Sequence, residues 1–129
     1  MDHLEPRQAQ EFLQRNPDAL FVDCRSEMEL AFVGYPLGSV HAAWNDGPQM
    51  ARNEEFAAQV RALAGGTARP VVLICRSGNR SVEAGEELER AGFTRVVNVL
   101  HGFEGELDQR NRRNTLSGWR HDGLPWEQS

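Results

Sequence analysis

The stretch Val71-Val72-Leu73-Ile74-Cys75-Arg76-Ser77-Gly78-Asn79-Arg80-Ser81 decides how the rest of this chain is organised. Its first four residues are an apolar, mostly β-branched run between a proline and polar residues, which is typical of a strand buried on both faces. The polar residues that follow do not continue a strand, and Gly78 tolerates a positive φ, so a tight turn is expected. From Ser81 onward, small or apolar residues recur at helical spacing, and Gly92 fits the end of a helix. The stretch therefore predicts a buried strand, a short loop and a helix.

Cys75 is the residue in this stretch that can carry chemistry. At a strand-to-helix turn it would face free backbone N–H groups and the positive end of the helix dipole. Arg76 and Arg80 add full positive charges. All three effects favour the thiolate, which is the nucleophilic form of cysteine. The alternative is an inert core cysteine, but such a residue has no need of two arginines in the next five positions.

Length and composition limit the classes of function. A chain of 129 residues suits one domain, spanning residues 1–129. A net charge of −5 and a pI near 5.3 argue against a nucleic-acid partner. No apolar run has membrane-spanning length, and Met1–Glu5 shows no signal-peptide pattern. Two distant cysteines are no secreted disulfide framework, which indicates a cytoplasmic protein.

The basic residues are all arginine, fourteen in number, and the chain has no lysine. Lysine bases, Schiff bases and phosphate-loop lysines are therefore excluded. The arginine-, alanine- and glycine-rich composition points to a bacterial source. The four histidines are scattered, and the chain has no C-x-x-C motif, so neither a metal site nor a cofactor is expected.

Further strands and helices are predicted to alternate along the chain. Helices are expected over Pro6–Leu13, from a capping box of Ser26 and Glu29 up to Gly34, and after Asn53, and strands over Ala19–Cys24, Ser39–Trp44 and Arg95–Leu100. This alternation predicts an α/β fold, with a mostly parallel central sheet and helices on both faces. Sites in such folds form beyond the carboxyl ends of the strands, where Cys75, Asp23–Arg25 and His101 stand.

The last third of the chain is predicted from composition. Phe103, Leu107 and Trp119 are candidate packing residues, and residues 110–117 form a polar surface loop. Gly123–Trp126 is expected to pack back on the domain.

These residues resemble a single-domain rhodanese of the sulfurtransferase family, over about Leu4 to Trp126. The most specific part is the loop Cys75-Arg76-Ser77-Gly78-Asn79-Arg80-Ser81 with the helix after it. Phe21–Arg25 looks like the family's first strand end, and Gly118-Trp119 and Gly123–Trp126 look like its C-terminal signature. The resemblance implies that Cys75 accepts a sulfane sulfur as a persulfide and passes it to a thiophilic acceptor.

The implied partners are a small sulfur donor such as thiosulfate and a cyanide or thiol acceptor, with a protein acceptor also possible in this family. Related phosphatases place five residues between the loop cysteine and arginine, whereas four separate Cys75 from Arg80. A loop shorter by one residue suits one sulfur atom better than a tetrahedral phosphate or arsenate. Two alternatives stay open: a phosphatase or arsenate reductase, and a carrier that hands a persulfide between proteins.

Four further features each have two interpretations. Cys24 is either a resolving thiol or a small apolar residue. Asp23 and Arg25 either touch substrate or form an ion pair that ties strand to helix. His101 either lines the pocket mouth or packs at the surface. The arginines of the polar loop, Arg110, Arg112 and Arg113, either dock an acidic partner or are solvated.

Overall fold

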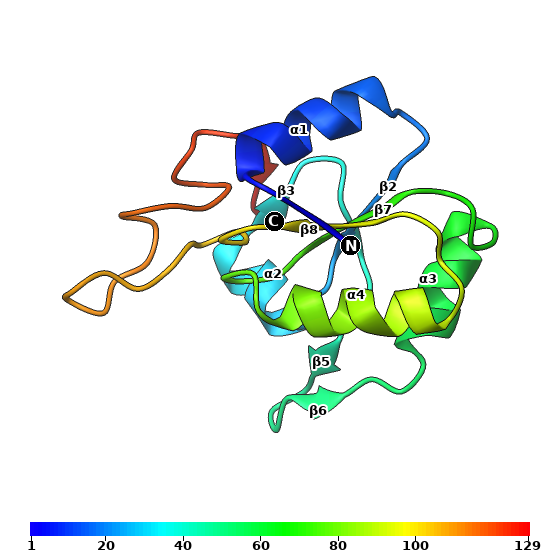
Figure 1. Cartoon of the computed structure of the whole chain (residues 1–129). Coiled ribbons are helices and arrows are strands. Elements are labelled where there is room, and N and C mark those ends of the chain that lie inside the picture. Colours follow the sequence, from blue (N-terminus) through cyan, green and yellow to red (C-terminus); the bar gives the residue numbers. More distant parts are fainter.

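A five-stranded parallel sheet forms the middle of the computed structural model, which describes residues 1–129 (Figure 1). The strand order is β1 (Asp2–Leu4), β8 (Val96–Val99), β7 (Val71–Ile74), β2 (Leu20–Asp23) and β4 (Val40–His41). The three central strands are buried along their whole length, which their apolar β-branched sequences require of a sheet covered on both faces. The predicted mostly parallel α/β sheet is confirmed.

Helices cover both faces of the sheet, as expected. α1 (Pro6–Arg15) lies on one face, and α3 (Phe56–Ala64) and α4 (Arg80–Arg90) lie on the other (Figure 1). Two apolar clusters correspond to the two faces: one joins Ala9 of α1 to Trp119, and the other joins Phe56 of α3 to Leu88 of α4. None of the helices combines the length and apolar character needed to cross a membrane.

The predicted capping box starts α2 (Glu27–Val33) at the carboxyl end of the sheet. The Ser26 side chain accepts from the Glu29 N–H, and the Glu29 carboxylate accepts from the Ser26 N–H at 3.2 Å. Gly34 ends the helix with a φ of 100°, a conformation that favours glycine. The sequence therefore positioned this helix correctly at both ends.

Three local predictions were wrong or incomplete. α3 begins at Phe56, because the Asn53 side chain accepts from the Glu55 N–H at 3.0 Å and closes a turn before the helix. The strand expected over Ser39–Trp44 is limited to β4, because the chain then leaves the sheet and Trp44 packs edge-on against Phe56 at 5.3 Å. Leu107 is exposed, whereas Phe103 and Trp119 are fully buried as predicted.

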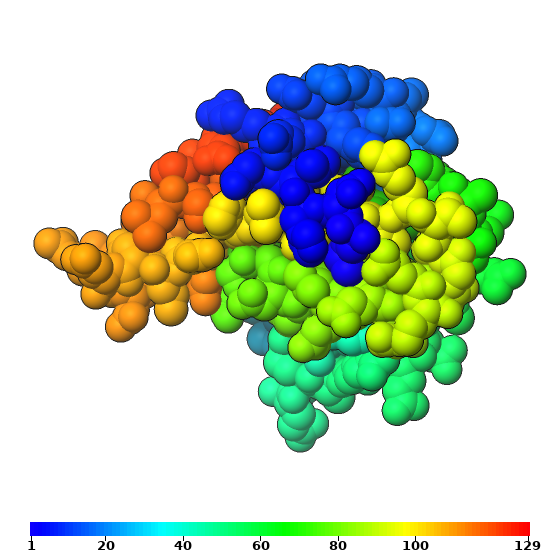
Figure 2. Space-filling model, viewed as in Figure 1, coloured from blue at the N-terminus to red at the C-terminus, as the bar shows by residue number.

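Several short strands carry no sequence pattern long enough to predict them. β5 (Asn45–Asp46) and β6 (Ala51–Arg52) form a ribbon, and β3 (Tyr35–Pro36) pairs with β9 (Trp126–Glu127). The β3–β9 pair is the expected packing of the C-terminal tail. Figure 2 shows the segment after β8, in orange, projecting from the body of the molecule.

Candidate active site

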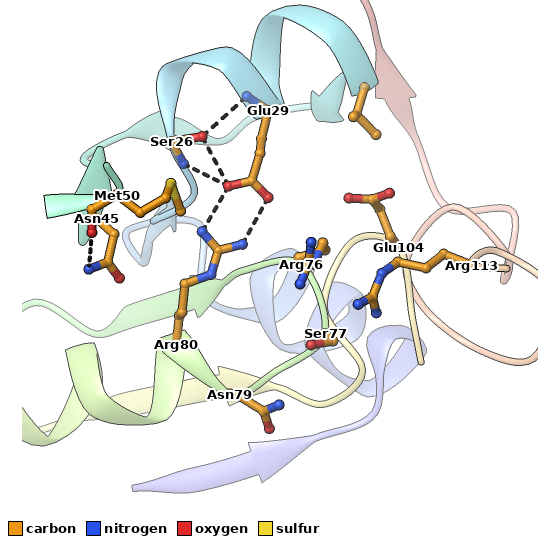
Figure 3. Close-up of a pocket in the computed structure, with 11 residues that line it drawn as sticks. Ser26, Glu29, Asn45, Met50, Arg76, Ser77, Asn79, Arg80, Glu104 and Arg113 are labelled. Carbon is orange, nitrogen blue, oxygen red and sulfur yellow. Dashed lines mark hydrogen bonds and ion pairs between the residues drawn. The ribbon is translucent and has the colours of Figure 1, made fainter. Parts of the chain in front are cut away.

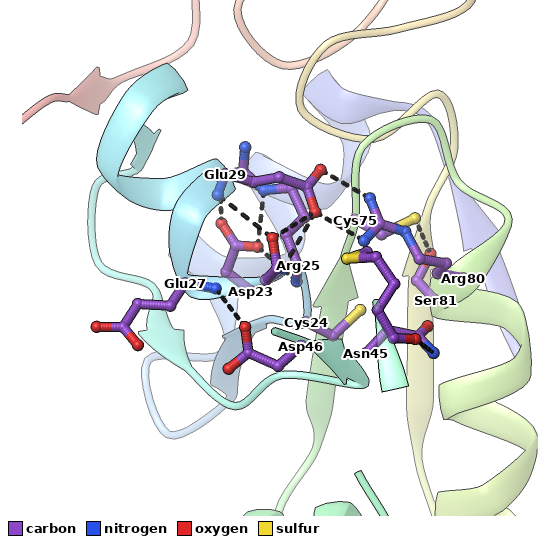
Figure 4. A network of polar contacts seen from close by, with 12 residues as sticks. Asp23, Cys24, Arg25, Glu27, Glu29, Asn45, Asp46, Cys75, Arg80 and Ser81 are labelled. Atoms are coloured by element: carbon purple, nitrogen blue, oxygen red, sulfur yellow. Dashed lines mark hydrogen bonds and ion pairs between the residues drawn. The ribbon is translucent and has the colours of Figure 1, made fainter. Parts of the chain in front are cut away.

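The loop between β7 and α4 folds around the sulfur of Cys75. The Gly78 N–H donates to Cys75 Sγ at 3.1 Å. Figure 4 shows the Ser81 hydroxyl beside the same atom, at 3.2 Å. α4 begins at Arg80, so the positive end of its dipole lies at this loop. Gly78 has a φ of 100°, which turns its N–H toward the sulfur.

This surrounding stabilises the thiolate of Cys75. A hydrogen bond from the Cys24 thiol is the largest influence, and burial opposes it. The N–H groups of Ser81 and Gly78 add to the stabilisation, as does the Ser81 hydroxyl when it points at the sulfur, and the pKa of Cys75 falls to about 5. The lowered pKa favours the thiolate of Cys75 at neutral pH.

Cys24 stands beside Cys75 at the end of the neighbouring strand. Asp23 pairs with Ile74 in the β2–β7 register, so the two cysteines are the next residues along. The Cys24 thiol donates to the Ile74 carbonyl oxygen at 3.3 Å, and its one hydrogen can turn to the Cys75 thiolate instead; the residue is fully buried. Its hydrogen bond with Cys75, burial and nearby negative charge raise the pKa of Cys24 well above its ordinary value. Cys24 is a protonated neighbour of the Cys75 thiolate.

A second turn, residues 101–104, supports the loop from behind. The Phe103 N–H donates to the Cys75 carbonyl at 2.8 Å, and the Glu104 N–H donates to the Arg76 carbonyl at 2.9 Å. A Cβ atom at Gly102 would overlap the Cys75 carbonyl oxygen, so only glycine fits there. Two loops far apart in the sequence thus hold one backbone conformation around the sulfur.

A cavity of about 780 Å³ opens above the loop (Figure 3). Arg76, Ser77, Asn79 and Arg80 of the loop line it. The other lining residues are Ser26, Glu29, Val33, Asn45, Met50, Glu104 and Arg113. Cys75 itself is 1% exposed and lies beneath the loop, outside the set of residues that line the cavity.

Arg80 is held by an ion pair across the cavity wall. Its guanidinium donates to both carboxylate oxygens of Glu29 at 2.8 Å, and Ser26 donates to the same carboxylate (Figure 3). Burial raises the pKa of Glu29, but the hydrogen bonds and charge of Arg80 outweigh it and lower that pKa to about 2. The pair in turn raises the pKa of Arg80. The capping box of α2 therefore also fixes the loop arginine.

Asp23 and Arg25 form the predicted ion pair, which is fully buried. Arg25 donates to both Asp23 oxygens at 2.9 and 2.6 Å and to the Gly34 carbonyl at 2.7 Å. Its guanidinium also stacks 4.4 Å from the centre of the Phe103 ring. Neither residue lines the cavity, so this pair ties β2 to the end of α2 and to the supporting turn.

His101 lies off the cavity, between the carboxylates of Glu5 and Glu106 at 3.2 and 3.5 Å. Sequence reasoning missed Glu29 as a site residue, although the capping box had already located it. Arg113 was expected either to dock an acidic partner or to be solvated, whereas it lines the cavity and donates to the Gly105 carbonyl at 2.8 Å. No local sequence signal distinguishes Arg113 from its arginine neighbours.

Comparisons with known proteins identify the family of this fold. The rhodanese-like domain family model matches residues 5–107. The crystal structure of Rv0390 from M. tuberculosis is 41% identical, with a TM-score of 0.89 over 100% of this chain and 98% of that one. The polysulfide-sulfur transferase of Wolinella succinogenes is 26% identical, with a TM-score of 0.66 over 100% of this chain and 80% of that one.

A curated protein of the sulfurtransferase class is also similar in sequence to this chain. Thiosulfate sulfurtransferase 16 of Arabidopsis thaliana, a chloroplastic protein, is 29% identical over 107 residues, which are 81% of this chain and 77% of that protein. The family match covers most of the chain. Cys75 of this chain lies at the carboxyl end of the parallel sheet. The chain belongs to the rhodanese-like domain family.

Proposed function

We propose that this protein is a sulfurtransferase that carries sulfane sulfur on Cys75. The observation that carries the proposal is the position of the Cys75 sulfur at the start of α4, where it accepts a hydrogen bond from the Gly78 N–H beneath a cavity lined by polar residues. Rhodanese-family relatives that are named as thiosulfate and polysulfide sulfurtransferases support the reaction class.

The reaction has two half-reactions. The Cys75 thiolate attacks the outer sulfur of a donor such as thiosulfate, a new S–S bond forms, and sulfite leaves with the electrons of the broken bond. The terminal sulfur of the resulting persulfide carries negative charge, which the loop N–H groups stabilise as in an oxyanion hole. Cyanide or a thiol then takes that sulfur, and the Cys75 thiolate returns. No general base is needed, because the nucleophile is already ionised.

The cavity is suited to an anionic donor. Three arginines and two glutamates line it, which leaves an excess of one positive charge. Because Glu29 holds Arg80, we assign the direct contact with the donor to Arg76 and Arg113. Arg80 then acts on the thiolate and the leaving group through its charge.

The short loop favours sulfur over phosphate. With four residues between Cys75 and Arg80, the ring of loop N–H groups is small, and Arg80 is committed to Glu29 in a two-bond ion pair. A tetrahedral phosphate would need both a wider ring and a free guanidinium. A carrier role uses the same persulfide and differs only in its acceptor, a protein thiol.

Intact-mass spectrometry after treatment with thiosulfate tests the proposal. The wild type is expected to gain the mass of one sulfur atom and to lose it on addition of cyanide, whereas Cys75→Ser gains nothing. Cys24→Ser is the matched control, because it removes the neighbouring sulfur, and it should gain one sulfur like the wild type. An unmodified wild type that hydrolyses an aryl phosphate would instead favour phosphatase chemistry.

A further inference from the structure

A chain of buried polar groups runs from the sulfur of Cys75 to the edge of the sheet. Ser81 Oγ lies 3.2 Å from Cys75 Sγ and 2.5 Å from Asn98 Oδ1. Asn98 Nδ2 lies 3.1 Å from His3 Nδ1. The sulfur is thereby connected through two buried side chains to an exposed histidine.

The fold places these groups in line. Asn98 stands between Val97 and Val99 in β8 and is 1% exposed, so its amide must find partners inside the protein. His3 and Asn98 are paired residues in the β1–β8 register, which puts both side chains on one face of the sheet. Ser81 in the first turn of α4 meets Asn98 from the helix covering that face.

The single hydroxyl hydrogen of Ser81 cannot serve both neighbours. When the Asn98 oxygen faces Ser81, the hydroxyl donates to that oxygen, and Ser81 offers the sulfur only a lone pair. This arrangement suits a neutral Cys75 thiol. When the amide is turned by a half rotation, its NH₂ donates to Ser81 Oγ, and the hydroxyl donates to Cys75 Sγ. The turned arrangement suits the thiolate.

The state of His3 decides between the two arrangements. An unprotonated Nδ1 accepts from the Asn98 NH₂ and holds the amide in the first arrangement. A protonated Nδ1 must donate, so it takes the amide oxygen and turns the NH₂ toward Ser81. The protonated ring has a proton on both nitrogens, and the neutral tautomer with its hydrogen on Nδ1 donates in the same way.

We propose that His3 and Asn98 are positioning residues, which, when His3 Nδ1 carries a proton, turn the Ser81 hydroxyl toward the sulfur of Cys75. No sulfur transfer passes through them. They act on the nucleophile alone, by setting the direction of one hydroxyl hydrogen. Because the coupling is reciprocal, the thiolate in turn favours the proton on His3.

Other charges also act on the two ends of this chain and must be separated from it. Around His3 these groups are three ion pairs: Asp2 with Arg95, the Met1 amino group with Glu89, and Glu5 with His101. Around Cys75 they are Cys24, Asp23, Glu29 and Arg80. Replacing His3 by Phe or by Gln removes the same imidazole charge, so these surroundings affect both variants equally. The two variants differ in that only Gln can donate to the Asn98 oxygen.

The test is a pH titration of the thiolate by its ultraviolet absorbance. His3→Phe should raise the pKa of Cys75 by about one unit, the order expected for losing a hydrogen bond to a charged group. His3→Gln should raise it by less than half as much. His121→Phe, which replaces an exposed histidine on the far segment, should titrate like the wild type.

A double-mutant cycle completes the test. Asn98→Leu removes the acceptor that competes for the Ser81 hydroxyl, so it should not raise the pKa of Cys75, and adding His3→Phe should then change nothing further, because the connection is already broken. Equal shifts in His3→Phe and His3→Gln, or full additivity in the cycle, would overturn the proposal. If Asn98→Leu does not fold, the comparison of the two His3 variants still decides. The absorbance is read without a substrate, so its outcome is independent of whether the proposed sulfur transfer occurs.

Discussion

Cys24 and Cys75 are the same residue type at the same depth, at the ends of neighbouring parallel strands, and their acidities shift in opposite directions. What differs is the backbone that follows each. After Cys75 the chain turns over the sulfur and aims the N–H groups of Gly78 and Ser81 at it. After Cys24 the chain continues to Arg25, whose positive charge is paired with the carboxylate of Asp23. The hydrogen bond between the two cysteines raises the pKa of Cys24 and lowers that of Cys75, and burial raises both. The loop donors act on Cys75 and not on Cys24, so Cys75 is the nucleophile of the pair.

The sharpest way to break this comparison is to remove each sulfur in turn. Cys75→Ser should lower the rate of thiosulfate:cyanide sulfur transfer at least about a thousandfold, as expected for loss of a covalent nucleophile. Cys24→Ser keeps a hydrogen-bond donor and should stay active. A steady-state assay of both variants checks this, and a dead Cys24→Ser with a normal fold would mean that both sulfurs react.

The half-buried ion pair between Glu29 and Arg80 can be compared with an exposed ion pair between Glu11 and Arg15. Glu29→Gln should lower the free energy of unfolding by about 2 kcal/mol, between the values for surface and buried pairs, because Arg80 is left unpaired. Glu11→Gln in the exposed pair with Arg15 should cost no more than about 0.5 kcal/mol. Urea unfolding followed by circular dichroism gives both values. Equal losses would show that the Arg80 pair is no more than a surface contact.

Alanine substitutions at Gly78 and Gly92 distinguish the cost of backbone strain from the loss of the Gly78 N–H contact with the Cys75 sulfur. Gly78 and Gly92 have φ values of 100° and 99°, so alanine at either should destabilise the fold by about 1–2 kcal/mol. A Cβ atom at Gly78 would also lie 3.1 Å from the backbone nitrogen of His101, whereas a Cβ atom at Gly92 would have none of the surrounding atoms within 4 Å. Gly78→Ala should therefore raise the pKa of Cys75 and slow sulfur transfer. Gly92→Ala should leave both unchanged, and identical kinetics in the two variants would argue against the Gly78 N–H contact.

The sequence predicted much of this because its signals are local. The apolar run of β7, the capping box of α2 and the loop cysteine each lie within a few residues. The missed features depend on contacts between distant segments. β1 has three residues and needs β8 beside it to be a strand. Glu29 reaches Arg80, and Arg113 reaches the cavity, only after the chain has folded.

A smaller effect measures how much Cys24 contributes to its neighbour. Cys24→Ala removes the thiol that donates to the thiolate and should raise the pKa of Cys75 by about one unit. Cys24→Ser retains a donor and should shift it less. The thiolate absorbance of each variant gives the pKa directly. Equal values in the wild type and Cys24→Ala would show that the loop alone sets the ionisation.

The most direct measurement of the central claim is the thiolate absorbance of the wild type, Cys24→Ser and Cys75→Ser between pH 3 and 9. Because the pKa of Cys75 is lowered, its thiolate is present above about pH 5 and lost as the pH falls through that value. The account predicts one thiolate near pH 5 in the wild type and Cys24→Ser and none below pH 8 in Cys75→Ser. A thiolate that persists in Cys75→Ser, or a wild type that ionises only above pH 8, would contradict it.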